Sequence, residues 1–306
     1  MIALRKVILR FQIEQVRKPI SWAGYLLSLP AALLLLALFL LPAASVVFIS
    51  MTNWQFGADD LSFIGGQNFL SLFFDHDFRT SLWNTLSYVL IVVPSTFFIG
   101  LTIAIAIEAG SSLRTFYRAI HFLPFMATLA AMALAWEALL HPTIGLINQI
   151  LTALHLPTEN WLRDERTVLP VLAAIGIWQN LGFAMILFLA GLKAIPQELY
   201  DAAEIDGADS WFDRLTTVTL PLLGPVSMFI LITVAVRAFE AFDTVQILTQ
   251  GGPGRSSDML LYSLYRESFR YLNTGYGAAI TVVFLVIIVG LTLFQARLFE
   301  RRIHYT

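Results

Sequence analysis

Long apolar runs separated by short polar segments dominate the chain. A helix needs about 20 apolar residues to cross the roughly 30 Å hydrocarbon core of a bilayer. Six charge-poor stretches meet that length, and they cover residues 22–49, 84–107, 119–140, 169–192, 225–248 and 276–295. The pattern therefore predicts an all-α integral membrane protein with six transmembrane helices.

The composition supports a membrane location and excludes several other classes. Of the 306 residues, 58% are hydrophobic and only 13% are charged, whereas soluble domains are about half apolar and a quarter charged. A net charge of -2 does not favour nucleic acid. The absence of cysteine excludes disulfides, thiolate metal sites and cysteine nucleophiles, and the five histidines lack metal-ligand spacing. We expect no metal and no bound cofactor.

The first stretch is too long for the core of a signal peptide, so we interpret it as an uncleaved anchor. Ahead of it, Leu4, Val7, Ile8 and Phe11 fall on one helical stripe surrounded by lysine and arginine. Such a pattern is typical of an amphipathic helix that lies on the membrane surface.

Lysine and arginine counts predict the orientation. Six spans leave both termini on one side, and that side carries 12 of the 19 cationic residues against 7 on the other. The positive-inside rule then places both termini in the cytoplasm of a bacterial or archaeal cell. The predicted division is a cytoplasmic segment over 1–21, a first helix over 22–50, an external loop over 51–83, a core of five spans over 84–298 and a cytoplasmic tail over 299–306.

The segment ELYDAAEIDGADSWFDRLTTVTLPLL, residues 198–223, is acidic in an otherwise apolar chain. Pro196 suits the first turn of a helix, and Leu199 with the following alanines gives that helix a small apolar face. Gly207 readily takes the left-handed conformation that ends a helix. Ser210, with Asp213 three residues later, predicts a capping box for a second short helix.

Small apolar residues flanked by carboxylates permit two interpretations. The alanines allow another surface to approach closely, and the acids can pair with arginines on that surface. The alternative is a solvated connector whose charges only prevent insertion into lipid. The pattern alone leaves both open.

The same segment resembles the EAA loop of ABC importer permeases, through Tyr200-Asp201-Ala202-Ala203, then Asp206-Gly207-Ala208, then Leu220-Pro221. Further landmarks of that family follow in order over residues 60–300. They are Phe63-Ile64-Gly65 with Asn68-Phe69, Asn84-Thr85-Leu86, Phe122-Leu123-Pro124, Trp178 with Gly182-Phe183, Leu189-Ala190-Gly191-Leu192, Ile195-Pro196, and Phe242-Asp243 with Leu248-Thr249-Gln250-Gly251-Gly252-Pro253. The last group resembles the carbohydrate-uptake branch, of the maltose-permease first-subunit type.

The resemblance implies the type I ABC importer permease fold, in which loop 196–222 is a cytoplasmic coupling helix that docks on an ATP-binding subunit. It also implies two such subunits, a second similar permease and an external substrate-binding protein. We expect the second permease to be a distinct homologous chain, although nothing in the sequence excludes a homodimer. Residues implied in coupling are Glu198, Asp201, Ala202, Ala203, Asp206, Gly207, Ala208, Leu220 and Pro221. The family usually has glutamate where this chain has Asp201, so a shorter stem carries that carboxylate.

The chain carries no phosphate-binding loop of the GxxxxGK[ST] type, and HExxH and GxSxG are also absent. We therefore expect a transporter subunit and not an enzyme, with ATP and magnesium bound by the partner ATPase subunits.

Polar groups within apolar spans are costly and usually functional. The candidates for a substrate pathway are Gln179, Asn180, Phe183, Arg237, Glu240 and Asp243. Amides and charges beside aromatic rings suit a polyhydroxyl ligand, because hydroxyls need hydrogen-bond partners while sugar C–H faces pack on rings.

Each candidate has a structural alternative. Arg237 and Glu240 are spaced to form a pair that fixes helix packing. Gln179 and Asn180 suit hydrogen bonds to the partner permease, and Asp243 suits a role in holding the external loop. Pro94 and Gly182 suit kinks in the second and fourth spans.

The leading prediction is a permease subunit of an ATP-driven importer for a carbohydrate or polyol. The alternative within the same branch is a glycerol-phosphate or sugar-phosphate importer, for which Arg237 is the candidate phosphate partner. A membrane-embedded enzyme using Glu137, Glu240 or Asp243, or a proton-coupled carrier, leaves the acidic loop unexplained.

Overall fold

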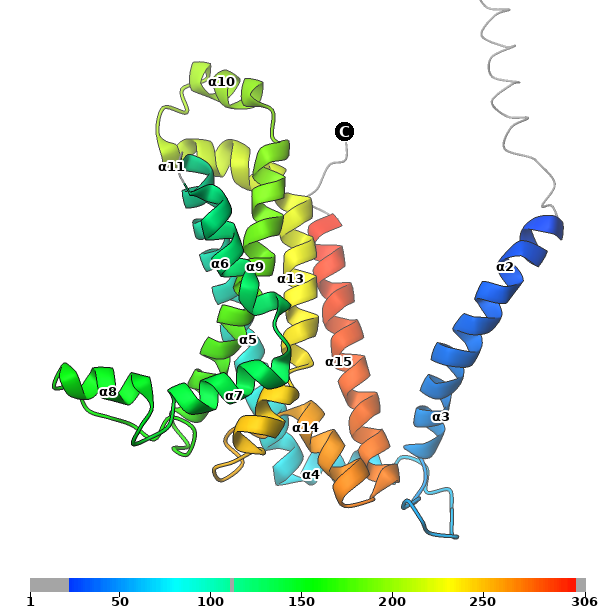
Figure 1. Ribbon diagram of the computed structural model, residues 1–306. Helices are drawn as coiled ribbons and strands as arrows, with labels where there is room; N and C mark the ends of the chain where they lie inside the picture. Colours follow the sequence, from blue (N-terminus) through cyan, green and yellow to red (C-terminus); the bar gives the residue numbers. More distant parts are fainter. Residues whose placement is uncertain (1–21, 111–112, 301–306) are drawn as a thin grey trace, which may run out of the picture.

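A computed structural model describes residues 22–110 and 113–300, and Figure 1 shows the arrangement of their helices. The surface helix predicted over residues 1–18 lies outside the described residues, as does most of the predicted tail. The helices in chain order are α2 (Trp22–Leu35), η1 (Leu36–Leu40), α3 (Leu41–Ile49), α4 (Gln67–Phe74), α5 (His76–Ala109), α6 (Arg114–Met126), α7 (Leu129–Leu139), α8 (Leu146–Ala153), α9 (Val168–Ala194), α10 (Gln197–Ile205), α11 (Trp211–Arg214), η2 (Leu215–Thr219), α12 (Leu220–Leu222), α13 (Gly224–Phe239), η3 (Val245–Thr249), α14 (Leu260–Tyr265), η4 (Arg266–Arg270) and α15 (Thr274–Glu300).

The predicted all-α class is confirmed, because the described residues form helices and one isolated β-bridge between Thr52 and Phe63. Four helical segments are long and apolar enough to cross a membrane: Gly24–Ile49, His76–Ala109, Val168–Ala194 and Thr274–Arg297. Two bent pairs bring the possible spans to 6. Six spans were predicted. One bent pair lies within the third of them, and the other, Trp211–Leu222 with Gly224–Phe239, bends just before the fifth.

The third predicted span, 119–140, is broken. α6 and α7 meet at an angle of 104°, and the chain is extended at Ala127 and Thr128 between them. Pro124 stands one turn before the break and cannot donate a backbone hydrogen bond. Apolar composition over 22 residues therefore did not reveal the change in direction.

The fifth predicted span, 225–248, is shorter than expected. α13 ends at Phe239, and a separate π-helical turn, η3, covers the last predicted residues. At its N-terminal end, α13 meets the helix over Trp211–Leu222 at an angle of 70°. The second span begins earlier than predicted, at His76, because the Asp75 carboxylate accepts a hydrogen bond from the Asp77 N–H at 2.8 Å and caps α5.

α5, α9 and α13 form the core of the bundle. Their buried side chains belong to one cluster that includes Val92, Ala104, Phe188 and Ile230, and Figure 1 shows the three helices running side by side. A second cluster packs α15 against α14 and the N-terminal end of α5 through Leu260, Ile280 and Phe284.

In the rod formed by α2, η1 and α3, α2 stands apart from this bundle, whereas the lower part of α3 approaches α15 (Figure 1). None of the rod's most apolar window is buried. The chain that follows the rod is tied to α4, because the Asn68 amide donates to the carbonyls of Ser50 and Thr52, both at 2.9 Å. In addition, the Gly275 N–H donates to the Trp54 carbonyl at 2.8 Å.

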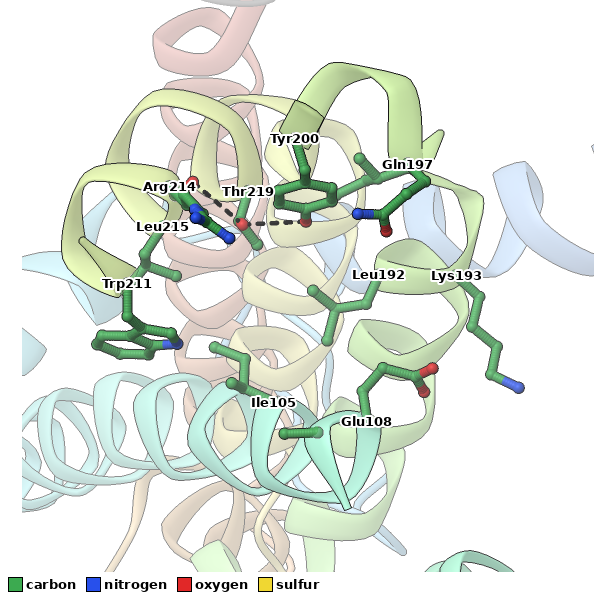
Figure 2. Close-up of a pocket in the computed structure, with 12 residues that line it drawn as sticks. Ile105, Glu108, Leu192, Lys193, Gln197, Tyr200, Trp211, Arg214, Leu215 and Thr219 are labelled. Carbon is green, nitrogen blue, oxygen red and sulfur yellow. Dashed lines mark hydrogen bonds between the residues drawn. The ribbon is translucent and has the colours of Figure 1, made fainter. Parts of the chain in front are cut away.

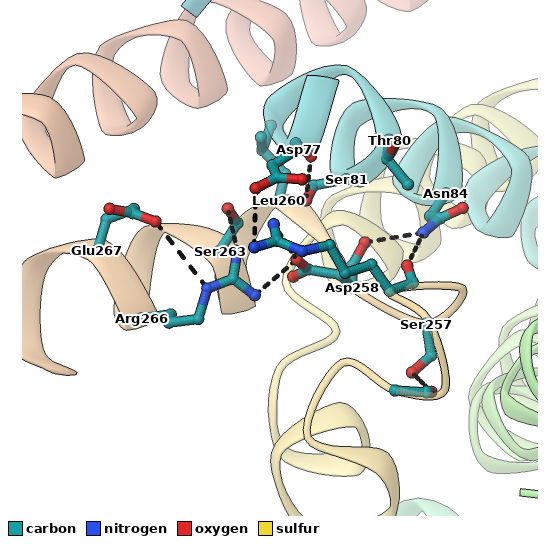
Figure 3. A network of polar contacts seen from close by, with 12 residues as sticks. Asp77, Thr80, Ser81, Asn84, Ser257, Asp258, Leu260, Ser263, Arg266 and Glu267 are labelled. Carbon is teal, nitrogen blue, oxygen red and sulfur yellow. Dashed lines mark hydrogen bonds and ion pairs between the residues drawn. The ribbon is translucent and has the colours of Figure 1, made fainter. Parts of the chain in front are cut away.

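A buried polar network, which we call the cap network, joins the loop after η3 to α5 (Figure 3). Asp258 is fully buried and forms an ion pair of 2.6 Å with Arg266, which is 8% exposed. Burial raises the pKa of the Asp258 carboxyl, against the opposing effects of Arg266 and Arg255. Arg255 also reaches Asp77 at 2.8 Å.

Two family landmarks on α5 complete the cap network. The Asn84 amide donates to the carbonyls of Arg255 and Asp258, at 2.9 and 3.1 Å. The Thr85 hydroxyl accepts from the Leu260 N–H at 2.8 Å. Polar residues in a membrane helix thus anchor a loop more than 170 residues away in the chain.

Candidate functional site

The acidic segment folds at the end of the molecule opposite α14, at the top of Figure 1. α10 spans Gln197–Ile205, with Pro196 at the N-cap position and not in the first turn as predicted. Gly207 has φ +94° and ends the helix as predicted. The Ala208 N–H reaches back to the Ala203 carbonyl at 2.8 Å, and the Gly207 N–H reaches Glu204 at 3.1 Å. This is the Schellman arrangement that left-handed glycines permit.

The second short helix begins as the sequence predicts. Ser210 accepts a hydrogen bond from the Asp213 N–H at 3.1 Å, and the Asp213 carboxylate accepts in return from the Ser210 N–H at 3.4 Å. The capping box is therefore confirmed. α11 continues into the π-helical turn η2 and the short α12, which brings Leu220 and Pro221 to the bend before α13.

Side-chain contacts hold α10 against the returning chain. Arg214 pairs with Glu204 at 3.1 Å, and its Nε donates to the Ala208 carbonyl at 3.2 Å. The Tyr200 hydroxyl lies 3.1 Å from that of Thr219. The segment is therefore a folded unit, although its exposed ion pair contributes less than about 1 kcal/mol.

The outer face of α10 is open to contact. Ile205 is 87% exposed, and Leu199, Glu198, Asp201 and Ala202 are also exposed. Asp206 and Gly207 continue this face at the helix end, whereas Ala203 and Ala208 are partly buried. The structure therefore groups seven of the predicted coupling residues on or beside α10 and places Leu220 and Pro221 elsewhere, at the bend into α13.

A cavity of about 700 Å³ lies beneath α10 (Figure 2). Tyr200, Gln197 and Trp211 line it from the loop, while Ile105 and Leu192 line it from the ends of α5 and α9. α10 is thus separated from the membrane helices by space, and the connected chain and a few side-chain contacts support it.

A second cavity, of about 280 Å³, lies inside the bundle where α5, α9 and the end of α13 meet. We call it the bundle cavity. Its lining consists of Tyr88, Gln179, Asn180, Arg237, Glu240, Ala241, Phe242, Asp243 and Thr244. Five of the six predicted pathway residues therefore line one cavity. Three of them, Arg237, Glu240 and Asp243, lie at or just after the end of α13, which is shorter than predicted.

The remaining candidate, Phe183, contacts this site through Arg237. The Arg237 guanidinium lies 4.5 Å from the centre of the Phe125 ring and 5.7 Å from that of Phe183. The two rings stack on each other at 5.2 Å. In the described part of the chain, Arg237 forms no ion pair with Glu240, so the predicted pairing is not formed and cation–π contacts take its place.

Asn180 is oriented by its own helix. It is 7% exposed, and its Nδ2 donates to the Gly176 carbonyl at 2.9 Å. Its Oδ1 is buried and has no hydrogen-bond partner within the described residues. A buried acceptor without a partner is costly, so this oxygen is a candidate ligand contact on the cavity wall.

Glycines allow the helices to approach around the bundle cavity. A Cβ on Gly176 would lie 2.1 Å from the Tyr88 hydroxyl, and one on Gly182 would lie 2.1 Å from the His121 carbonyl. α9 runs unbroken through Gly182, and α5 runs unbroken through Pro94. The kinks predicted at Pro94 and Gly182 therefore do not break either helix, and Gly182 allows the close approach of α6.

Some site residues were missed or misassigned. The bundle cavity is also lined by Tyr88 and Thr244, and the Arg237 guanidinium lies over the Phe125 ring. In the sequence these three residues look like ordinary residues of apolar helices. Asp243 makes no side-chain hydrogen bond or ion pair within the described residues, so it does not hold the external loop; Asp258 does. Among those residues no group of three His, Asp or Glu is placed to hold a metal ion.

Comparisons with known proteins agree with this architecture. The sequence profile of the family described as binding-protein-dependent transport system inner membrane component matches residues 25–305. The probable ABC transporter permease protein YurN of Bacillus subtilis is 32% identical over 280 residues, covering 90% of this chain and 95% of that protein. The sn-glycerol-3-phosphate transport system permease protein UgpA of Yersinia enterocolitica is 33% identical over 291 residues, covering 93% and 96%.

A solved structure gives the same fold. A chain of a bacterial ABC transporter involved in the import of the acidic polysaccharide alginate superposes with a TM-score of 0.79, over 92% of this chain and 96% of that one. Its sequence identity is 23%, so the likeness concerns the fold.

Proposed function

The chain belongs to the family of inner-membrane components of binding-protein-dependent transport systems, and we propose that it forms half of a translocation pathway for a carbohydrate or polyol. It is a multi-pass permease subunit of an ABC importer and not an enzyme. The resemblance noted in the sequence is thereby confirmed. Its cargo, its contacts with partners and the orientation of its termini belong to the proposal.

The coupling surface in this proposal is the outer face of α10. The observation that carries it is a folded, capped helix whose exposed face holds small and acidic residues, Ala202 and Asp201 among them. Small side chains allow close approach, and carboxylates pair with arginines on a partner. ATP-driven closure of two ATPase subunits would move α10, and these subunits would hold ATP and magnesium.

The second permease chain and the binding protein are assigned to other surfaces of the chain. The exposed rod α2–α3 offers a membrane-depth surface to a second permease chain, and we propose a distinct homologous chain as that partner. The binding protein would dock at the end that carries α14, so the α10 end faces the cytoplasm together with both termini. Lysine and arginine counts support this orientation.

The cargo is assigned from the bundle cavity. Amides, acids and a cation beside aromatic rings match the hydroxyls and C–H faces of a sugar or polyol. The second candidate is a glycerol phosphate or sugar phosphate. Arg237 on the cavity lining favours it, as do relatives named for sn-glycerol-3-phosphate transport.

The decisive experiment compares two charge reversals in one loop. Asp201→Arg changes the outer face of α10, whereas Asp209→Arg changes an exposed acid outside that helix. In proteoliposomes with the complete complex, Asp201→Arg is expected to lower binding-protein-stimulated ATP hydrolysis and uptake at least tenfold, which corresponds to about 1.4 kcal/mol. Asp209→Arg is the matched control and should remain near wild type.

Recovery of the ATPase subunits with the purified permease separates coupling from assembly. Normal stimulated hydrolysis and uptake by Asp201→Arg would reduce the loop to a solvated connector. The coupling proposal would then be wrong, whatever the cargo.

A further inference from the structure

The bundle cavity presents an unusual balance of charge and hydrogen-bonding groups. We propose that it selects hydroxyl-rich cargo without a phosphate group, and that Asn180, Glu240 and Asp243 are the groups that read the hydroxyls. This inference rests on the proposed function and decides between its two candidates.

Acceptors outnumber obligate donors on the lining. The buried Asn180 Oδ1 has no partner among the described residues, and the carboxylates of Glu240 and Asp243 are pure acceptors. Tyr88, Thr244 and Gln179 can both donate and accept. Arg237 is the lining side chain that only donates. A ligand that matches this wall must bring its own donors, which hydroxyl groups do and a phosphate dianion does not.

The charge balance points the same way. Two carboxylates face one guanidinium around the cavity. Glu240 is also the C-cap of α13, whereas Thr244 on the same lining is the N-cap of η3, so helix ends of both signs lie at the cavity. The excess of carboxylates is therefore what opposes the entry of an anion.

Arg237 is already engaged. Its guanidinium lies over Phe125 and near Phe183, both within cation–π range. A phosphate would have to draw it away from the two rings, while a neutral sugar could receive a hydrogen bond from it in place. The one cation that made a phosphorylated cargo attractive in the sequence is therefore poorly placed to bind one.

The cavity potential can be measured without knowing the cargo, because the chain has no cysteine. Ala241→Cys places a thiol on the cavity lining. Ala153→Cys places one at an exposed position at the end of α8, a helix without charged residues. Labelling rates of this chain in the complete complex are compared for a trimethylammonium and a sulfonate methanethiosulfonate reagent, with and without ATP.

Relative to Ala153→Cys, the cationic reagent is expected to be favoured roughly tenfold at Ala241→Cys. Adding Glu240→Gln and Asp243→Asn should remove that preference, and adding Arg237→Gln should increase it. The proposal is wrong if the sulfonate reagent is favoured, if neutralising both acids changes nothing, or if neither reagent reacts at Ala241→Cys.

Inorganic phosphate provides the direct probe. At ionic strength matched with chloride, it should not slow labelling of Ala241→Cys by uncharged methyl methanethiosulfonate. Protection by phosphate that disappears with Arg237→Gln would instead establish a phosphate site. These rates do not depend on uptake, so their failure is distinct from failure of the coupling experiment.

Discussion

The two ends of the bundle are built in opposite ways. At the α14 end, the cap network is buried and joins residues 171–175 positions apart. At the α10 end, the Arg214–Glu204 ion pair is exposed, and the part-buried Tyr200–Thr219 contact spans only 19 positions. A buried network between distant segments opens only with the core, whereas contacts within one loop can open separately. The comparison suggests that one end is fixed to the helices while the other is arranged to move.

The strongest test of the fixed end is Asp258→Ala. It leaves Arg266 buried without its carboxylate, which is expected to cost about 3–5 kcal/mol of stability. Thermal unfolding of the purified complex in detergent measures the loss, with Asp59→Ala at an exposed acid as the control. The double variant Asp258→Leu, Arg266→Met should recover much of it. An unchanged unfolding temperature for Asp258→Ala would show that the cap network does not stabilise this end of the bundle.

A smaller effect is expected from Thr85→Val. This change removes the acceptor of the buried Leu260 N–H, at a cost of about 1–3 kcal/mol. Thr102→Val is the matched control on α5, because Thr102 makes the same i−4 hydrogen bond but is exposed and holds no distant segment. Equal unfolding temperatures for the two variants would show that the anchor carries no stability.

The smallest stability change is expected at the movable end, from Tyr200→Phe. Loss of one hydroxyl contact with Thr219 should cost about 0.5–1.5 kcal/mol locally. Global unfolding should hardly shift, but the uptake obtained per ATP hydrolysed should fall. Tyr117→Phe, at an exposed tyrosine, is the control. If Tyr200→Phe destabilised the complex as much as Asp258→Ala, the contrast between the ends would not hold.

The sequence predicted best what is determined locally. Gly207 and the Ser210–Asp213 pair define the ends of neighbouring helices through contacts within a few residues. Glu240 and Gln179 stood out because polar groups are rare in apolar spans. The class and the number of possible spans followed from length and composition alone.

Features that depend on distant partners were not predicted. The break after α6 is an abrupt change of direction within a uniformly apolar run, and Gly182 acts through the His121 carbonyl on another helix. The role of Asp258 requires Asn84 and Arg266 together. Composition and periodicity carry no information about which residues from distant parts of the chain come into contact.

The cavity beneath α10 determines how force travels. Because about 700 Å³ of space separates α10 from the end of α5, a push on α10 has no solid column of side chains to follow. It passes along the backbone, backward through Ile195 and Pro196 into α9 and forward through η2 and α12 into α13. Beside this route, the described part of the chain offers it only the polar Arg214–Glu204 and Tyr200–Thr219 contacts. Because so few side chains bridge this space, we expect the first part of any displacement to be absorbed within the loop. We therefore expect a threshold stroke, below which the ATPases move and the walls of the bundle cavity do not.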